Sequence, residues 1–335
     1  MFKLKKRILT GIKPTGTPHI GNYLGAIKPA ISLMEDENAE CFYFIADIHA
    51  LTTIDNKKDL QQHIYEVACT WLACGLDPDK AIFYRQSDIS DIFELFSILT
   101  NLTPKGLMNR AHAYKAATDR NRVADREIDD GINMGLYNYP ILMTADILLF
   151  NTDFVPVGLD QKQHIEIARD IANYFNHRYG SNIKLPEELI SEEVMTLPGI
   201  DGRKMSKSYD NVIPLFEAEK TLRKRIFSIV TDSTGPNEPK DLNNTIYQIY
   251  KAFASDEEAR IFAEKFHYGI SWAEAKEELF SVVNNYLAPM REKYNYYMNN
   301  KNVVDEILNT GAERAKILAR NRMNKIRKSV GLQQK

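Results

Sequence analysis

Short strand-like runs alternate with helical stretches through the first two-thirds of the chain, and this order predicts an α/β fold with a parallel sheet. The strand signal ends near Pro214, after which apolar residues recur at helical spacing. With 335 residues the chain is long enough for two domains. We therefore expect a Rossmann-like parallel-sheet domain over residues 1–213, followed by an all-helical domain over residues 214–335.

The elements of the first part follow from composition and periodicity. Runs rich in β-branched and aromatic residues predict strands, and longer stretches between them predict helices. The strands are expected at residues 8–10, 41–45, 81–84 and 154–157, and the helices at residues 20–34, 60–74, 89–99 and 136–150. Strands separated by helices form βαβ units with right-handed crossovers. In such a sheet, ligands bind beyond the carboxyl ends of the strands, where the strand order reverses.

The second part is predicted to be helical throughout. Ile246, Ile249, Tyr250 and Phe253 repeat at the spacing of one helix face. The change of pattern places the boundary near residues 212–216. It leaves open whether the last helices pack back on the first domain.

Composition narrows the class of protein. Hydrophobic residues make up 44% of the chain and charged residues 26%, as in ordinary soluble globular proteins. No apolar run approaches the ~20 residues of a membrane span, and no secretion signal is recognised at the N-terminus. Cys41, Cys69 and Cys74 are widely spaced in apolar segments, which favours core packing in a reducing compartment. We expect a cytoplasmic protein without membrane contacts.

The charge is unevenly distributed. The net charge of −2 argues against a surface broadly adapted to nucleic acid. Residues 314–328 nonetheless carry basic side chains and no acidic ones: Arg314, Lys316, Arg320, Arg322, Lys325, Arg327 and Lys328. Two interpretations stay open, a solvated helix whose cations suit its C-terminal dipole and a contact with a phosphate backbone.

A turn dense in glycine and proline follows the first predicted strand. The spacing of Gly11 and Gly16 matches a P-loop, but Thr17-Pro18 stands where Lys-Ser/Thr is required, which excludes that motif. The next helix is expected to begin near His19, so its free N–H groups favour an anion. His19 and Asn22 can donate hydrogen bonds to phosphate or ribose. A buried histidine at a helix start is the alternative interpretation.

The run Lys204-Met205-Ser206-Lys207-Ser208 predicts a short basic loop. Gly199 and Gly202 precede it and suggest a hinge that lets the loop close over a ligand. Its two lysines suit phosphate oxygens on which charge accumulates, a task that Mg²⁺ shares. Such a run alone is more often a solvated surface loop. Its pairing with the turn at His19 favours ATP bound between the two motifs.

Asp146 stands inside an almost wholly apolar helical stretch, residues 139–150. Tyr139 and Met143 share its helix face, because the three residues are spaced i, i+4 and i+7. A carboxylate there is costly unless it is paired. An internal salt bridge is one explanation. The other is a mostly apolar ligand with a single buried donor, which describes an indole ring.

Together these motifs carry a family resemblance. The segments around His19 and Lys204 resemble the signature pair of the class I aminoacyl-tRNA synthetases, and residues 139–164 resemble the tryptophanyl-tRNA synthetases. The tyrosyl enzymes of the same branch have Gln where this chain has Met143. The similarity extends over nearly the whole chain. It implies a ligase that activates L-tryptophan with ATP to tryptophanyl-adenylate plus pyrophosphate, then transfers it to tRNA(Trp).

The resemblance also implies residue roles. It assigns catalysis to His19, Lys204 and Lys207. Tryptophan would be bound by Asp146 at its indole N–H, by Tyr139 and Gln161 at its amino and carboxylate end, and by a pocket of Met143, Ala46, His49, Val155 and Val157. ATP, with Mg²⁺ as cofactor and without a protein metal site, would contact Lys13, Pro14, Thr15, Gly21, Asn22, Gly158, Leu159, Asp160, Val194, Lys204, Met205, Ser206, Lys207 and Ser208.

The chain departs from the family pattern at three places. Lys13 stands where many bacterial members carry Gln, so an extra cation is expected near the phosphates or the substrate carboxylate. Leu159 replaces a common acidic residue. Residues 116–132 look longer and more polar than usual, so Lys115 is either a phosphate contact or part of a mobile surface loop.

Partners and competing functions follow from the same comparison. The resemblance implies a symmetric homodimer in which each tRNA touches both subunits, with the anticodon read by the helical domain through residues such as Arg223, Lys224 and Arg225. The alternatives are a tyrosyl-tRNA synthetase and a non-catalytic synthetase-like protein that binds tRNA or nucleotide. A nucleotidyltransferase shares the turn at His19 but lacks the substrate helix and the second domain.

Overall fold

The computed structural model describes residues 5–158, 161–181, 183–190 and 197–332. At its centre is a five-stranded sheet in the order β3-β2-β1-β4-β5, with every neighbouring pair parallel. The strands are β1 (Lys6–Ile12), β2 (Ala39–Ile45), β3 (Ile82–Arg85), β4 (Phe154–Pro156) and β5 (Glu187–Leu189). The predicted α/β fold is thus confirmed. The strand order reverses at β1, which places the ligand crevice of such a sheet between β1 and β4.

The sheet separates two hydrophobic cores. Cys41, Tyr43 and Ile45 of β2 point into one core, and Phe42 and Phe44 point into the other. This alternation is the period of two that a strand imposes. Because both faces are buried from Cys41 to Ile45, this part of β2 is a continuous apolar run, as expected for a central parallel strand.

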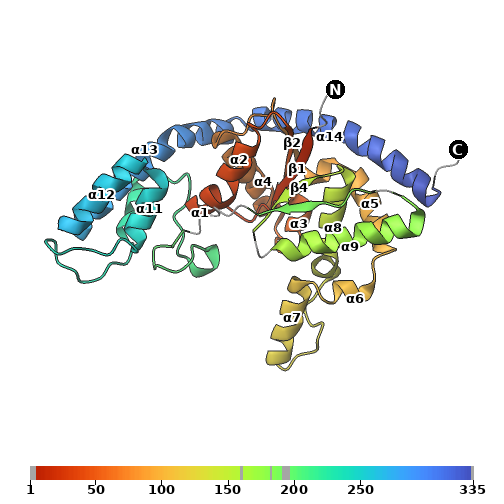
Figure 1. The fold of residues 1–335 in the computed structure, drawn as a ribbon, viewed down its shortest axis with the longest axis horizontal. Helices are drawn as coiled ribbons and strands as arrows, with labels where there is room; N and C mark the ends of the chain where they lie inside the picture. Colours follow the sequence, from red (N-terminus) through yellow and green to blue (C-terminus); the bar gives the residue numbers. More distant parts are fainter. Residues whose placement is uncertain (1–4, 159–160, 182, 191–196, 333–335) are drawn as a thin grey trace.

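Helices cover both faces of the sheet (Figure 1). The helix expected after β1 is interrupted, because a π-helical turn, η1 (Tyr23–Ile27), joins α1 (Ile20–Asn22) to α2 (Lys28–Leu33). The other elements up to residue 227 are α3 (Asp47–Ala50), α4 (Lys57–Ala73), η2 (Gln86–Asp88), α5 (Asp91–Thr100), α6 (Lys105–Met108), α7 (His112–Val123), α8 (Met134–Leu149), α9 (Lys162–Tyr179), η4 (Lys207–Tyr209) and α10 (Glu219–Phe227).

The remaining helices are α11 (Thr245–Phe253), α12 (Asp256–Tyr268), α13 (Trp272–Asn299) and α14 (Lys301–Val330). In Figure 1, α11 and α12 lie to one side of the sheet, while α14 runs back across it. Gly311 of α14 lies against β3, where an added Cβ would be 1.8 Å from the carbonyl oxygen of Phe83. Only glycine permits the helix to approach the strand this closely.

The basic run on α14 contributes to this docking. The guanidinium of Arg314 donates to the carbonyl oxygens of Pro78 at 2.8 Å and Ala81 at 3.2 Å. Arg327 forms an ion pair with Glu94 of α5, with a 2.7 Å hydrogen bond from its Nε. These two cations are therefore engaged within the chain, which supports a structural role for them.

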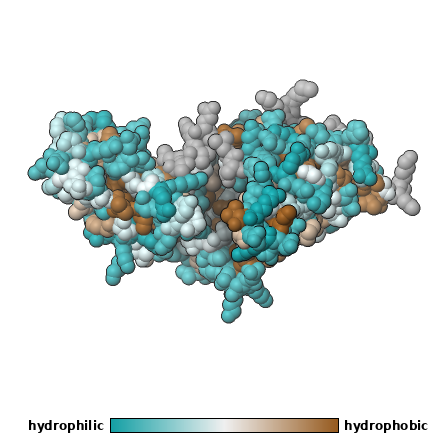
Figure 2. Space-filling model, turned by 90° about the horizontal axis from the view of Figure 1, so that it is seen from below, coloured by the Kyte–Doolittle hydropathy of each residue, from teal (hydrophilic) through white to brown (hydrophobic). Residues whose placement is uncertain are grey.

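Among the described residues, no helix combines the length and the apolar character that a bilayer crossing requires. The face seen in Figure 2 is largely hydrophilic, and its apolar side chains form small, separate groups. Cys41, Cys69 and Cys74 are free thiols, and the first two are buried.

Candidate functional site

Polar side chains gather where β1, β2 and β4 end and where α8 passes, and they line two adjoining cavities. The first, of about 550 Å³, lies between the turn after β1 and the loop of residues 204–208. The second, of about 410 Å³, lies between the ends of β1 and β2 and helix α8. Lys13 lines both cavities, because it directly follows the last residue of β1.

His19 and Asn22 begin the helix after β1 by capping each other. The backbone N–H of Asn22 donates to Nδ1 of His19 at 3.3 Å, and the backbone N–H of His19 donates to the Asn22 side chain at 3.1 Å. Burial, together with the nearby Lys207 ammonium, lowers the pKa of His19 to about 4. The imidazole is therefore neutral at pH 7, and because Nδ1 accepts, Nε2 carries the proton and can donate to a ligand.

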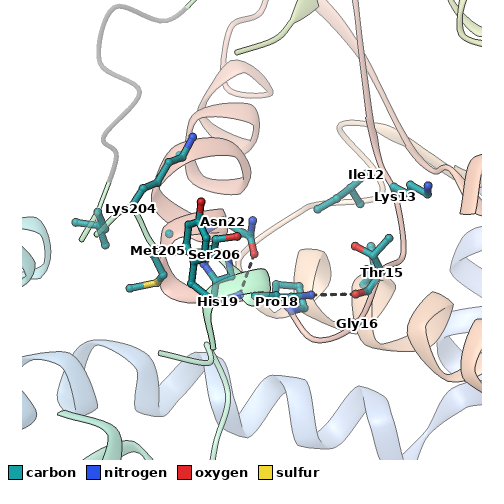
Figure 3. Close-up of a pocket in the computed structure, with 16 residues that line it drawn as sticks. Ile12, Lys13, Thr15, Gly16, Pro18, His19, Asn22, Lys204, Met205 and Ser206 are labelled. Atoms are coloured by element: carbon teal, nitrogen blue, oxygen red, sulfur yellow. Dashed lines mark hydrogen bonds between the residues drawn. The ribbon is translucent and has the colours of Figure 1, made fainter. Parts of the chain in front are cut away.

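Gly21 keeps the wall of the first cavity flat. An added Cβ would be 3.0 Å from the His19 ring and 3.5 Å from the sulfur of Met205. Figure 3 shows His19 and Asn22 at the helix start, with Lys204, Met205 and Ser206 on one side and Lys13 and Thr15 on the other. The two sequence motifs thus form opposite walls of one cavity.

The loop of residues 204–208 is held by Asn211, a residue that is 1% exposed. Its Oδ1 accepts from the backbone N–H of Ser206 at 2.8 Å, and its Nδ2 donates to the carbonyl oxygen of Lys204 at 3.1 Å and to Asp201 at 2.7 Å. Gly199 leaves room for this amide, since a Cβ there would be 2.4 Å from it. The role of Asn211 could not be predicted from the sequence, because a single asparagine beside a polar loop carries no periodic signal.

Lys207 joins the two walls, because its ammonium donates to the carbonyl oxygen of Thr15 at 3.2 Å. Burial lowers the pKa of Lys207, and burial likewise lowers the pKa of Lys13. The Lys13 ammonium donates to Oγ1 of Thr52 at 2.8 Å, and no carboxylate of the described residues forms an ion pair with it. Both ammonium groups therefore face the cavities with charge available for an anion.

Asp146 is the acidic residue of the second cavity and is 1% exposed. Its carboxylate accepts from Nε2 of His49 at 3.0 Å and from the amide of Gln86 at 2.9 Å to each oxygen. Burial raises the pKa of Asp146, and the hydrogen bonds from His49 and Gln86 oppose that shift. Gln86 was not recognised in the sequence, because it directly follows a strand in a three-residue 3₁₀ turn.

The rest of the second cavity is largely apolar. Ala46, Met143 and Val155 line it, together with Tyr139 and Gln161. The Tyr139 hydroxyl hydrogen bonds to Nε2 of His164 at 2.5 Å. Nδ1 of His164 lies 2.8 Å from Oε1 of Gln161, an acceptor, so Nδ1 carries the proton and Nε2 accepts from Tyr139.

Several predicted residues lie elsewhere. Val157 and Gly158 line a third cavity, a groove against α2 that shares Gly25 with the first cavity. Strand β4 ends at Pro156, so the alternation from Val155 is not continued. Pro14 is buried and Ser208 bonds to Ser206 through its hydroxyl at 2.8 Å, and neither residue lines the first cavity. Leu159, Asp160 and Val194 lie outside the described residues.

The expectation of a surface loop over residues 116–132 is wrong for the first half of this region, which is helical. Residues 116–123 belong to α7, and the Asn121 amide donates to the carbonyl oxygens of Ile128 and Asp130. This polar segment has no apolar face, but it is rich in residues of high helix propensity, and it therefore folds as a helix. Lys115 is exposed and lines neither of the two cavities.

Two of the cations expected at an anticodon are engaged within the chain. Arg223 pairs with Glu277 at 2.5 Å and lies over the Phe227 ring, and Arg225 lies 3.7 Å from Asp210. Lys224 is exposed.

Comparison with known proteins gives one consistent result. Residues 3–288 match the family model of the class I tRNA synthetases for W and Y. The chain is 51% identical over 332 residues to a tryptophan–tRNA ligase of Bordetella pertussis, covering 98% of this chain and 74% of the relative. A tryptophan–tRNA ligase of Pseudomonas aeruginosa is 51% identical over 330 residues, covering 97% and 74%. The crystal structure of tryptophanyl-tRNA synthetase from Campylobacter jejuni complexed with ADP and tryptophan superimposes with a TM-score of 0.89 at 43% identity, covering 97% of this chain and 99% of that one.

Proposed function

The chain belongs to the class I tRNA synthetases for tryptophan and tyrosine, among the tryptophan–tRNA ligases, and from this membership we propose a role for each wall of its two cavities. The enzyme converts L-tryptophan and ATP to tryptophanyl-adenylate and pyrophosphate, then transfers the tryptophanyl group to tRNA(Trp). The observation that carries our assignment is the pair of cavities that meet at Lys13, one lined by lysines and the other apolar with a buried acid.

The second cavity binds tryptophan. The Asp146 carboxylate accepts a hydrogen bond from the indole N–H, while Tyr139 and Gln161 hold the amino and carboxylate end. The indole ring lies against Met143, Ala46, His49 and Val155 of the second cavity, and we propose a further contact with Val157, which lines the groove against α2. A phenylalanine side chain leaves the buried carboxylate without that donor, at a cost of roughly 1–3 kcal/mol.

The first cavity binds ATP. His19 donates through Nε2 to a phosphate oxygen, and Lys204 and Lys207 stabilise the charge on the leaving pyrophosphate. The other proposed contacts are Lys13, Pro14, Thr15, Gly21, Asn22, Gly158, Leu159, Asp160, Val194, Met205, Ser206 and Ser208. In the reaction a tryptophan carboxylate oxygen bonds to the α-phosphorus, the bond to the bridging oxygen breaks, and pyrophosphate leaves. Lys13 lies where carboxylate and α-phosphate meet.

Mg²⁺ accompanies ATP in this proposal. The described residues that line the first cavity include no carboxylate, and Mg²⁺ prefers oxygen anions. These walls therefore fit the ion as a complex with the ATP phosphates, where it would neutralise phosphate charge.

The test is amino-acid-dependent ATP–pyrophosphate exchange with tryptophan, tyrosine and phenylalanine in turn. We expect strong exchange with tryptophan alone. Exchange with tyrosine and none with tryptophan would favour the tyrosyl alternative, and no exchange with any of the three would favour a non-catalytic protein.

We further propose two domains, residues 1–213 for catalysis and residues 214–335 for the anticodon of tRNA(Trp), in a symmetric cytoplasmic homodimer. The helical content of the second part supports this division, and its last helix, α14, packs back on the sheet of the first part. Light scattering of the purified protein tests the dimer, and a monomer at micromolar concentration would contradict it.

A further inference from the structure

Gln86 lies behind Asp146 and takes no part in the cavity wall. It directly follows β3 and its side chain is fully buried. Starting from the proposed function, we propose that Gln86 is a positioning residue that determines specificity: its amide holds the Asp146 carboxylate, so that a free lone pair faces the indole N–H of tryptophan.

The side chains of Gln86 and Asp146 are in close contact, and the hydrogen bonds between them can run in only one direction. Nε2 of Gln86 lies 2.9 Å from both carboxylate oxygens of Asp146. Only the NH₂ group can donate to a carboxylate, so the amide orientation is set by chemistry. Its own Oε1 accepts the backbone N–H of His49 at 3.4 Å. Gln86 therefore holds the carboxylate from behind, while His49 contacts it from the cavity side at 3.0 Å.

The backbone of Gln86 is fixed independently of Asp146. The next residue, Ser87, donates from its backbone N–H to Asp47 at 3.0 Å and from its hydroxyl at 2.5 Å. Asp47 opens α3, the helix that carries His49. The two donors to Asp146 thus belong to segments tied together at the ends of β2 and β3. A substitution of the Gln86 side chain should leave that framework in place.

The hydrogen bonds also keep Asp146 ionised. The polar groups that face its carboxylate are the Gln86 amide on η2, the His49 imidazole on α3 and the Tyr84 phenol on β3. Burial raises the pKa of Asp146, and donors that stabilise the anion lower it. Without the Gln86 amide the carboxylate protonates at a higher pH, and a protonated acid is a poorer acceptor for the indole N–H.

The experiment compares tryptophan with β-(3-benzothienyl)alanine, in which sulfur replaces the N–H, in pyrophosphate exchange by wild type and Gln86→Met. Methionine has a similar volume and lacks the amide. We expect wild type to prefer tryptophan in kcat/KM and the variant to lose about tenfold or more of that preference. The KM for ATP should stay unchanged. In the pH profile of the KM for tryptophan, the rise on the acid side should begin at a higher pH.

Gln248→Met, an exposed change on α11, is the matched control and should behave as wild type. Should Gln86→Met fail to fold, Gln86→Glu gives the same test, because a second carboxylate beside Asp146 also raises its pKa. An unchanged preference and an unchanged acid side of the pH profile in either folded variant would overturn the role of Gln86. Failure of wild type to use tryptophan would instead refute the proposed function.

Discussion

Each key side chain of the site owes its chemical state to a few neighbours. His19 is neutral because it is buried beside Lys207, and its proton sits on Nε2 because Nδ1 accepts from the chain. Asp146 stays a usable acceptor because His49 and Gln86 donate to it. The site therefore depends on a second layer of contacts as much as on the residues that face a ligand.

His19 should make stability depend on pH. Its folded pKa of about 4 lies below the unfolded value of 6.5, so the unfolded chain binds the extra proton first. The free energy of unfolding therefore has its full value above pH 6.5 and decreases as the pH falls toward 4. At pH 5 the loss amounts to about 2 kcal/mol. Urea unfolding at pH 7.5 and pH 5 should show a larger loss for wild type than for His19→Gln. Equal losses would contradict the burial of a neutral imidazole.

Asp146→Asn should lower kcat/KM for tryptophan by about tenfold to a hundredfold, because the charged acceptor is lost and the new amide competes with Gln86. The KM for ATP and the melting temperature should change little. Steady-state exchange kinetics and thermal unfolding measure the two quantities. An unchanged tryptophan KM and turnover would remove Asp146 from the pocket.

At the scale of single residues, the sequence allows a functional residue to be predicted when its chemistry conflicts with the pattern around it. Asp146 could be recognised because an acid inside an apolar helix requires a reason. Gln86 and Asn211 could not, because their partners are distant in sequence or lie within a short loop. The sequence carries no signal for contacts that only the tertiary structure creates.

At the scale of elements, the basic loop of residues 204–208 is fixed at several points by hydrogen bonds. Asn211 bonds to both Lys204 and Ser206, and Lys207 reaches Thr15 on the opposite wall. Predicted strands 8–10, 41–45, 81–84 and 154–157 were found within two residues of their bounds, because each is a run of apolar or β-branched residues. Strand β5 was missed, since Glu-Glu-Leu has no such signature.

Asn211→Ala should slow pyrophosphate exchange about tenfold, because three hydrogen bonds that place the loop lysines are lost. Asn299→Ala, at the exposed end of α13, is the control. Since Asn211 acts through the lysines, adding its substitution to Lys204→Ala/Lys207→Ala should cause no further loss. A fully additive loss in the triple variant would show that Asn211 acts by another route.

At the scale of the whole molecule, α14 unites the two cores. Val304 and Leu308 belong to the core on one face of the sheet, and Ala312 and Ala315 belong to the core on the other. The helix crosses from one to the other at Gly311, beside the backbone of β3. Sequence periodicity identified a helical region here but could not show that its final helix runs along the sheet.

Gly311→Ala should destabilise the protein by about 1–3 kcal/mol, because the new methyl group meets the Phe83 carbonyl and neither backbone can yield cheaply. Gly106→Ala is the matched control, since a Cβ there meets no atom within 4 Å. Urea denaturation measures both free energies of unfolding. Equal stability of the two variants would mean that α14 shifts along β3 without penalty.

The position of α14 has a consequence for biosynthesis. β3 is at one end of the described sheet, and the helix that covers its open side is made more than 200 residues later. At ribosomal rates of roughly 5–20 residues per second, β3 is synthesised on the order of tens of seconds before α14. During that interval its unpaired amides can recruit another chain, so this enzyme should rely on holding chaperones while it is being translated.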